Sequence, residues 1–342
     1  MNAIPLDHNG VELSYSDSGA PAQIPYITIV AVHGMGFTHA IFKKVQAIAS
    51  KANVRFVAVV RRGYKGSSPF SGAEIAAQTG GTDEEKLDFL NARGIELAIF
   101  VDKLIRQLDV PPITGDGKSG GVALLGWSAG TMLTLASIAN LDKLSPELKT
   151  RFAAYIRAHI MEEPPSACLG LPIPPQIWFS LVDPSIPENE RTPFYTSWVT
   201  SYFDHGDLTS HDMNAVSYAA PSLRRAPSIY NMSEEDVKKI LVPEVILHEF
   251  GSIGATFTQN IVIYRKACYD PTVGELLPRM KTSVLAGDST VAFSMNGLLS
   301  LQDENNERKG DIHFEVAPGL NHFMQWDEPE KTFQLYMKLA LL

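Results

Sequence analysis

The sequence predicts an α/β fold: a mostly parallel sheet flanked by helices, with a mainly helical cap inserted before the last two strands. Short apolar runs alternate with segments of helical periodicity, which is the pattern of strand–helix–strand units. Between residues 164 and 280 this alternation stops, and proline and aromatic residues become dense. Because that segment is too long for a loop, we expect residues 1–163 and 281–342 to form the core and residues 164–280 to form an inserted cap.

The individual elements follow from local patterns. Asn9-Gly10 between apolar segments predicts a hairpin, and the β-branched runs 27–32 and 54–60 predict strands that are buried on both faces of the sheet. Apolar residues at helical spacing from 97 to 108 predict a helix that packs on the sheet. Further strands are expected at 122–125, 155–161, 283–286 and 312–316, and a last helix at about 329–341.

Composition excludes several classes of function. The 342-residue chain has a formal net charge of -9, which argues against a nucleic-acid-binding surface because phosphate binding needs clustered Lys and Arg. The two cysteines, Cys168 and Cys268, indicate no disulfide framework, so we expect a reduced, cytoplasmic compartment. No run approaches the roughly 18 apolar residues that a membrane span needs. The expected partner is a small-molecule substrate, and the sequence does not indicate an oligomeric state.

A serine lies in a G-x-S-x-G pattern between an apolar run and a helix-like segment. Gly126, Ser128 and Gly130 match the pattern, the apolar run covers 122–125, and the helix-like segment covers 131–140. A serine at a tight strand-to-helix turn has a strained backbone and an exposed hydroxyl. Its neighbours two residues away must be small so that the strand and the helix can approach each other. Ser128 is therefore the candidate nucleophile.

A glycine-containing loop, His33-Gly34-Met35-Gly36, follows the strand predicted at 27–32. Backbone N–H groups in such a loop can point at one anion, which is what an oxyanion hole requires. We expect His33 to shape this loop rather than to transfer protons. Arg61 and Arg62 begin a turn-rich loop after the next strand, and we expect them to have structural or surface roles rather than to bind substrate.

These motifs, together with the 62–68 loop and Gly319-Leu320-Asn321-His322, give a sequence that resembles the α/β-hydrolase superfamily over nearly its whole length. The resemblance implies that Ser128 is the nucleophile and that His322 is the general base. In that chemistry the base takes the serine proton as the hydroxyl attacks a carbonyl carbon, and then protonates the leaving group.

The resemblance also implies an oxyanion hole formed by the backbone N–H groups of Ala129 and Met35, with Gly34 as the alternative to Met35 in the loop. We expect no cofactor. His205 and His211 have aspartates nearby, but their spacing matches no metal-ligand pattern, so we expect a solvated loop there and no metal site.

The acid of the triad is where the sequence departs from the common pattern. Most family members place an aspartate three residues after the glycine that ends the strand before the last one. Counting from Gly287, that position is Thr290, and Asp288 comes only one residue after the glycine. A minority place the acid after the preceding strand, directly before Pro-Pro, where this chain has Glu163. We favour Glu163 as the acid, keep Asp288 as the alternative, and expect Glu162 to point away.

The expected function is a cofactor-free serine hydrolase that cleaves a carboxylic ester or lactone of an apolar, small to medium substrate through an acyl-enzyme intermediate. Serine in place of aspartate at the elbow argues against the epoxide hydrolases and haloalkane dehalogenases of the superfamily. The chain also distantly resembles fungal hydrolases of mycotoxin lactones. Hydrolysis of a C–C bond is the enzymatic alternative, and a weakly catalytic ligand receptor on the same fold is the alternative from another class.

Overall fold

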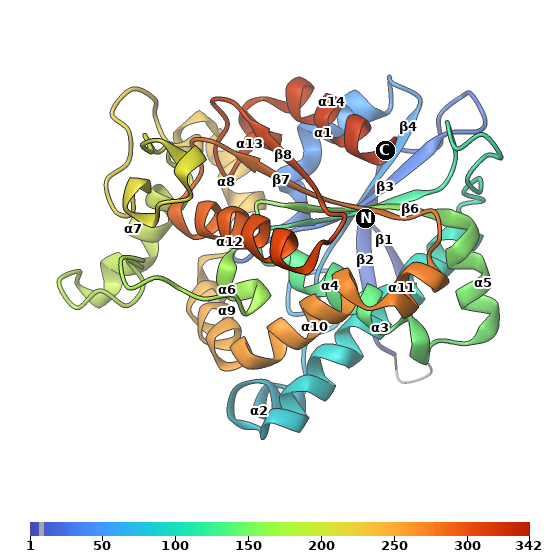
Figure 1. The fold of residues 1–342 in the computed structure, drawn as a ribbon, viewed down its shortest axis with the longest axis horizontal. Helices are drawn as coiled ribbons and strands as arrows, with labels where there is room; N and C mark the ends of the chain where they lie inside the picture. Colours follow the sequence, from blue (N-terminus) through green and yellow to red (C-terminus); the bar gives the residue numbers. More distant parts are fainter. Residues whose placement is uncertain (7–9) are drawn as a thin grey trace.

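The computed structural model describes residues 1–6 and 10–342, which form an eight-stranded sheet with helices on both faces (Figure 1). The strands span Asn2–Pro5 (β1), Glu12–Asp17 (β2), Ile27–Val32 (β3), Val54–Val59 (β4), Val122–Trp127 (β5), Ile156–Glu162 (β6), Lys281–Gly287 (β7) and His313–Ala317 (β8). Their order in the sheet is β1-β2-β4-β3-β5-β6-β7-β8. The β1–β2 and β2–β4 pairs are antiparallel and the other pairs are parallel. The predicted fold class is confirmed.

The predicted hairpin corresponds to β1 and β2, which pair with Ile4 opposite Leu13. Part of its predicted turn, Asn9, lies outside the described residues. Every residue of β3, β4, β5 and β6 is buried. This burial on both faces explains why these strands read as continuous apolar runs in the sequence rather than as alternating ones.

Two layers of helices cover the sheet (Figure 1). One layer contains α3 (Asp83–Gln107), α4 (Gly130–Ala139), α5 (Pro146–Tyr155) and α12 (Ala292–Arg308), and the other contains α1 (Lys43–Ala49), α13 (Met324–Asp327) and α14 (Pro329–Ala340). The helix α3 begins with a capping box, in which the Thr82 hydroxyl accepts from the Glu85 N–H and the Glu85 carboxylate accepts from the Thr82 N–H. None of the helices in the described part of the chain is both long and apolar enough to cross a membrane.

The segment predicted as a cap contains α6 (Ser166–Leu169), α7 (Glu188–Val199), α8 (Glu234–Ile240), α9 (Pro243–Ala255), α10 (Phe257–Tyr269) and α11 (Pro271–Leu276). In Figure 1, α7 lies beyond one end of the sheet, at the left of the view. The helix α10 instead packs against α4, and α11 packs against α5. The last part of the segment therefore belongs to a helical layer of the sheet, and the division at residue 280 stays a prediction.

Shorter helical elements complete the chain. They are α2 (Gly72–Gly80) and the 3₁₀ helices η1 (His39–Phe42), η2 (Leu141–Lys143), η3 (Leu208–Ser210), η4 (Met213–Ala215) and η5 (Ser228–Asn231). The parallel strands β3, β5, β6, β7 and β8 end at the same edge of the sheet because they run in one direction. The loops that follow them therefore meet there, which is where α/β sheets bind their ligands.

Candidate active site

Ser128 lies at the turn between β5 and α4, in the left-handed backbone region with a φ of 53°. A Cβ atom on Gly130 would lie 2.2 Å from the carbonyl oxygen of Val32, and one on Gly126 would lie 2.6 Å from the hydroxyl of Thr134. Gly126 is therefore required by the close approach of β5 and α4, as the motif predicts, and Gly130 by the close approach of α4 to the end of β3. The Ser128 residue is 7% exposed.

Glu163 and His322 meet at the same edge of the sheet. Glu163 follows β6, His322 lies in the loop after β8, and the Oε2 atom of Glu163 is 3.1 Å from the Nδ1 atom of His322. Oε2 also accepts from the Thr290 hydroxyl, and Oε1 accepts from the Gly287 N–H at 2.6 Å. The glutamate is fully buried and the histidine is 2% exposed. The Gly287 N–H and the Thr290 hydroxyl therefore hold a buried carboxylate against the imidazole.

Asp288, the alternative acid, makes different contacts. Its Oδ1 atom accepts from the Gly319 N–H at 2.7 Å and from the Ser289 hydroxyl at 3.2 Å. It therefore braces the loop that leads to His322 and does not bond the imidazole. Thr290, which stands at the common position of the acid, donates its hydroxyl to Glu163 instead.

Glu162 points to the other side of the strand, as expected from the alternation of side chains along an extended chain. Its Oε2 atom accepts from the Tyr336 hydroxyl of α14 at 2.7 Å. Burial, together with the nearby charge of Glu163, raises the pKa of Glu162 to about 8. The two adjacent glutamates thus have different surroundings, and Glu163 is the one at His322.

Further contacts fix the position of His322. The Ser294 hydroxyl of α12 is 3.2 Å from the Nδ1 atom of His322 and donates to the carbonyl oxygen of Glu163 at 3.1 Å. The indole N–H of Trp127, the residue before Ser128, donates to the His322 carbonyl oxygen at 2.9 Å, and the two rings lie 5.4 Å apart. The histidine is thereby tied to the serine turn. No pattern in the sequence indicated Ser294.

The loop after β3 lies directly against the serine turn. A Cβ atom on Gly34 would be 2.9 Å from the Cβ atom of Ser128. The Gly34 carbonyl oxygen accepts from His33 Nδ1 and from Arg61 Nη1, both at 3.0 Å. In a trans peptide the N–H of Met35 points opposite to that carbonyl. In the described part of the chain, the N–H groups of Met35 and Ala129 bond no acceptor, and both residues line the pocket of Ser128. This orientation favours Met35 over Gly34 as an oxyanion donor.

His33 has the structural position that we expected for it. It is fully buried, its Nε2 atom accepts from the Arg61 N–H at 3.1 Å, and its Nδ1 atom therefore donates to the Gly34 carbonyl. Burial and the positive charge of Arg61 lower the pKa of His33 well below its usual value. A neutral ring is thus built into the loop.

A half-buried ion pair joins this loop to the inserted segment. Arg61 bonds Glu249 of α9 at 2.5 Å, and the other carboxylate oxygen of Glu249 accepts from the Tyr64 hydroxyl at 2.5 Å and from the Gly36 N–H at 3.3 Å. The segment before α9 also pairs with the loop, through a β-bridge between Phe37 and Leu241. The sequence contained no signal for Glu249, because the two partners of the ion pair are 188 residues apart.

The pocket that contains Ser128 encloses about 440 Å³, including its mouth. Met35, Ala129 and Phe293 come from the core, and the remaining lining residues come from the inserted segment: Pro165, Ala167, Cys168, Phe179, Tyr195, Phe250 and Ile253. Burial raises the pKa of the Cys168 thiol to about 12, so this group is neutral. The pocket is therefore apolar apart from its serine. The neighbouring Trp178 and Trp198 rings pack on each other.

The histidines considered for a metal site are engaged otherwise. The Nε2 atom of His205 is 2.8 Å from the Thr290 carbonyl oxygen, and its Nδ1 atom accepts from the Ser217 N–H at 3.0 Å. His211 bonds Asp303. Within residues 1–6 and 10–342, no three His, Cys, Asp or Glu side chains are arranged to hold a metal ion.

Comparisons with known proteins identify the fold and the family of the chain. The structure is similar to a thioesterase domain from the curacin biosynthetic pathway (TM-score 0.52, 16% identity, 98% of this chain and 99% of the other) and to epoxide hydrolase A from Mycobacterium thermoresistibile (TM-score 0.51, 14% identity, 99% and 97%). It is also similar to a bromoperoxidase from Bacillus anthracis (TM-score 0.50, 15% identity, 98% and 99%). At these identities the likeness shows the fold alone, and no curated protein matches the sequence. Residues 29–335 match the sequence model of the alpha/beta hydrolase family, so the chain belongs to that family.

Proposed function

We propose that this protein is a serine hydrolase that cleaves a carboxylic ester or lactone through an acyl-enzyme intermediate. The observation that carries the proposal is the buried Glu163–His322 pair at 3.1 Å, held beside a serine in a strained strand-to-helix turn. The nucleophile, the orienting acid and the base occur along the chain in the order Ser, acid, His, which is the order that the fold uses for this chemistry.

The roles of the residues follow from their contacts. Glu163 accepts the Nδ1–H of His322, which leaves the Nε2 atom free of a proton and able to act as a base. Nε2 takes the Ser128 proton while Oγ attacks the carbonyl carbon, and the N–H groups of Met35 and Ala129 stabilise the negative oxygen. The intermediate collapses as His322 protonates the leaving alcohol. Water then releases the acid by the same steps and restores the serine.

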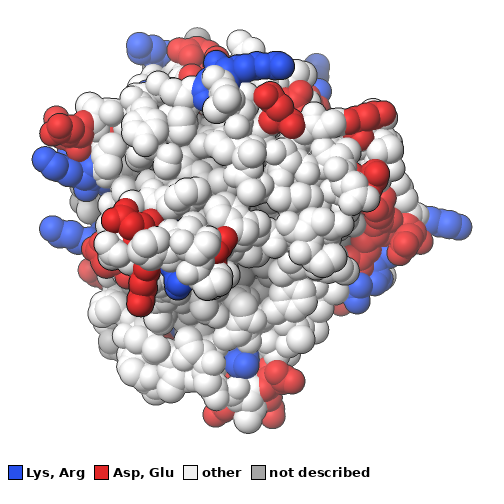
Figure 2. Space-filling model, turned by 90° about the vertical axis from the view of Figure 1, so that its left-hand side faces the viewer, with Lys and Arg blue, Asp and Glu red and all other residues white. Residues whose placement is uncertain are grey.

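The surroundings of Ser128 support an apolar, uncharged substrate of small to medium size. The pocket lining is aromatic or aliphatic apart from the serine and the neutral Cys168 thiol. Figure 2 shows the side of the molecule that lies at the left in Figure 1, where most of the upper central surface is formed by residues other than Lys, Arg, Asp and Glu. A charged group would lose its hydration in such a pocket without gaining a partner.

The test combines turnover with labelling of the serine. We expect hydrolysis of p-nitrophenyl esters by the wild-type protein and labelling by a fluorophosphonate probe, with both lost in Ser128→Ala. Mass spectrometry of the labelled peptide locates the modified residue. Turnover that persists in Ser128→Ala would contradict the proposal. Saturable binding of esters without any turnover by the wild-type protein would favour a ligand receptor on the same fold.

A further inference from the structure

A second cavity lies next to the pocket of Ser128, between α2, α3, α4 and α9. The space among its lining residues is about 880 Å³, part of which is open to solvent. We call it the second chamber; Leu90, Arg93, Leu133 and Ser252 are among the residues that line it. Ala129 and Ile253 line both cavities, so the second chamber begins at the residue that follows the candidate nucleophile.

Most of the wall of the second chamber is apolar. Phe89, Leu90 and Leu97 of α3 form one side, and Leu133 of α4 faces the same space. These side chains can bury a hydrocarbon chain or a ring at about 25 cal/mol for each Å² removed from water. The second chamber is therefore suited to an apolar group that extends from the reacting carbonyl.

Polar atoms without partners line the same cavity. The Ser252 hydroxyl, the Gln78 Oε1 atom and the Arg93 Nε atom are buried and have no hydrogen-bond partner in the described part of the chain. Ser252 is 3% exposed. A helical serine commonly bonds the carbonyl four residues earlier, as the Thr256 hydroxyl does with the Ser252 carbonyl, but the Ser252 hydroxyl does not. Because leaving a buried polar group unpaired is unfavourable, these atoms point to a ligand with a matching polar group.

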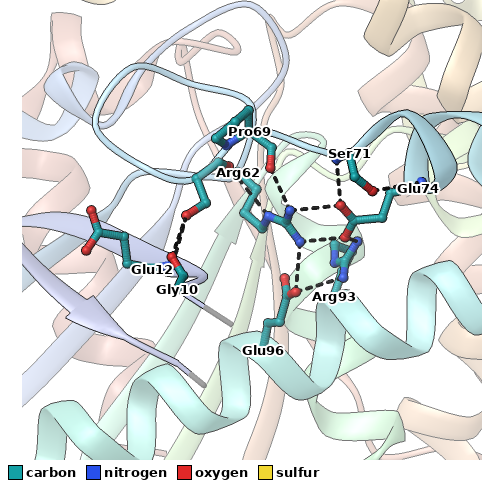
Figure 3. A network of polar contacts seen from close by, with 9 residues as sticks. Gly10, Glu12, Arg62, Pro69, Ser71, Glu74, Arg93 and Glu96 are labelled. Atoms are coloured by element: carbon teal, nitrogen blue, oxygen red, sulfur yellow. Dashed lines mark hydrogen bonds and ion pairs between the residues drawn. The ribbon is translucent and has the colours of Figure 1, made fainter. Parts of the chain in front are cut away.

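The charged residues around the second chamber neutralise each other. Arg62 lies between Glu74 and Glu96, and Arg93 bonds both of these carboxylates, with nitrogen–oxygen distances of 2.7 to 2.9 Å (Figure 3). Arg61 is paired with Glu249 in the same way. Since every one of these guanidinium groups already has a carboxylate partner, an anionic ligand gains no free positive charge here. The polar group of the ligand is therefore neutral.

We propose that the second chamber binds the part of the substrate that is remote from the scissile bond. The ligand class is a neutral, elongated ester or lactone with an apolar body and a hydroxyl or carbonyl group at its far end. Its reacting carbonyl lies at Ser128, its body passes Ile253, and its far end meets Ser252, Gln78 and Arg93. This proposal rests on the proposed function, and it names the substrate class of that site.

Chamber filling tests the apolar part of the proposal. Leu133 is only partly buried, so the larger side chain of Leu133→Trp can be accommodated there. It occupies part of the second chamber and reduces the space left for a ligand. We expect the ratio of kcat/KM for p-nitrophenyl decanoate to kcat/KM for p-nitrophenyl acetate to fall at least tenfold. Leu335→Trp on α14, also partly buried but on the opposite face of the sheet, is the matched control and is expected to leave the ratio unchanged. An unchanged ratio in Leu133→Trp would overturn the proposal.

Removal of the serine hydroxyl tests the polar part. The wild-type protein is expected to prefer p-nitrophenyl 10-hydroxydecanoate over both the decanoate and the p-nitrophenyl monoester of decanedioic acid, which is anionic. Ser252→Ala is expected to reduce the preference for the hydroxylated ester over the decanoate about fivefold, the size of one neutral hydrogen bond. Ser180→Ala removes another buried, unpartnered hydroxyl outside the chamber and serves as the control. Equal effects of the two variants would overturn the assignment of the far-end group.

Binding to the inactive protein separates this inference from the proposed function. Calorimetry with Ser128→Ala and intact p-nitrophenyl 10-hydroxydecanoate gives a Kd that needs no turnover. We expect Leu133→Trp in that background to raise the Kd at least tenfold. If the wild-type protein fails to hydrolyse every ester, the proposed function falls, while the second chamber is still judged by this Kd. If Leu133→Trp does not fold, as a thermal melt would show, the Kd of Ser252→Ala decides.

Discussion

Glu163→Gln removes the charge of a carboxylate that accepts from three donors while keeping its shape. The Gly287 N–H, 2.6 Å from Oε1, holds the amide oxygen of the glutamine on that side. The amide N–H₂ then takes the place of Oε2, beside Thr290 and the Nδ1 atom of His322. Because an N–H₂ group only donates, Nδ1 becomes the acceptor and the imidazole proton moves to Nε2.

The magnitude follows from this change of tautomer. A histidine that carries its proton on Nε2 cannot take the proton of Ser128. The corresponding aspartate-to-asparagine change in a serine protease lowers kcat about 10⁴-fold, which is about 5.4 kcal/mol at 1.36 kcal/mol for each tenfold change in rate. Losing one charge-assisted hydrogen bond without a tautomer change is worth only about 1.5–3 kcal/mol. We therefore expect a loss in kcat of about 10³-fold or more.

The assay is kcat on one p-nitrophenyl ester, with Ser128→Ala as the blank and Asp288→Asn as the matched control. Asparagine keeps the oxygen that accepts from the Gly319 N–H, so Asp288→Asn is expected to retain kcat within about threefold, as for substitutions that preserve their contacts. Thermal melts check that both variants fold. A loss of several orders of magnitude in Asp288→Asn, with near-normal kcat in Glu163→Gln, would refute the reasoning and make Asp288 the acid.

Three further expectations concern the surroundings of the site. Thr290→Asp combined with Glu163→Gln puts a carboxylate at the common acid position, and its kcat is expected to exceed that of Glu163→Gln alone about tenfold; an equal or lower kcat would contradict this. Glu249→Gln replaces the ion pair with Arg61 by a neutral contact and so loosens the loop after β3. We therefore expect kcat to fall about tenfold with KM little changed, whereas Glu244→Gln on the exposed side of the same helix is expected to change neither. Burial raises the pKa of Glu162 from 4.5 to about 8. Between these pH values the folded state therefore binds more protons than the unfolded state, so the free energy of unfolding falls as the pH rises from 4.5 to 8. Urea unfolding at pH 5 and pH 8 is expected to show a smaller pH-dependent loss for Glu162→Gln than for the wild type, and equal losses would contradict the assignment.

Local patterns in the sequence were sufficient for the sheet. Every predicted strand is present, with its ends shifted by two residues or fewer. This worked because strands buried on both faces need continuous apolar, β-branched runs, and the serine turn needs its two glycines for contact with Val32 and Thr134. The apolar runs and the G-x-S-x-G motif each occupy consecutive residues, so the sequence alone could indicate them, although the contact of Gly130 with Val32 joins segments that are far apart in the chain.

The inserted segment was much less predictable. Its proline and aromatic density indicated an insertion, but nothing in the sequence showed that α10 would pack against α4 while residues such as Phe179 and Phe250 would line the Ser128 pocket. The same amphipathic helix can bury its apolar face against any apolar surface. The surface that such a helix packs against depends on the path of the chain between helices. The local hydrophobic periodicity gives no information on that path.

The sequence by itself indicated the fold class, the family and two candidate residues. The strand–turn–helix motif indicated Ser128, and the resemblance to the family implied His322. The resemblance favoured Glu163 over Asp288, but only the tertiary structure shows their contacts: Glu163 meets His322, 159 residues away, and Asp288 meets Gly319, 31 residues away. These distances depend on how the loops pack. Only the tertiary structure also shows that Glu249 contacts the loop after β3 and that the second chamber lies beside Ala129. Long-range contacts and cavities form only when the whole chain is folded. Local patterns of residue types in the sequence therefore do not predict them.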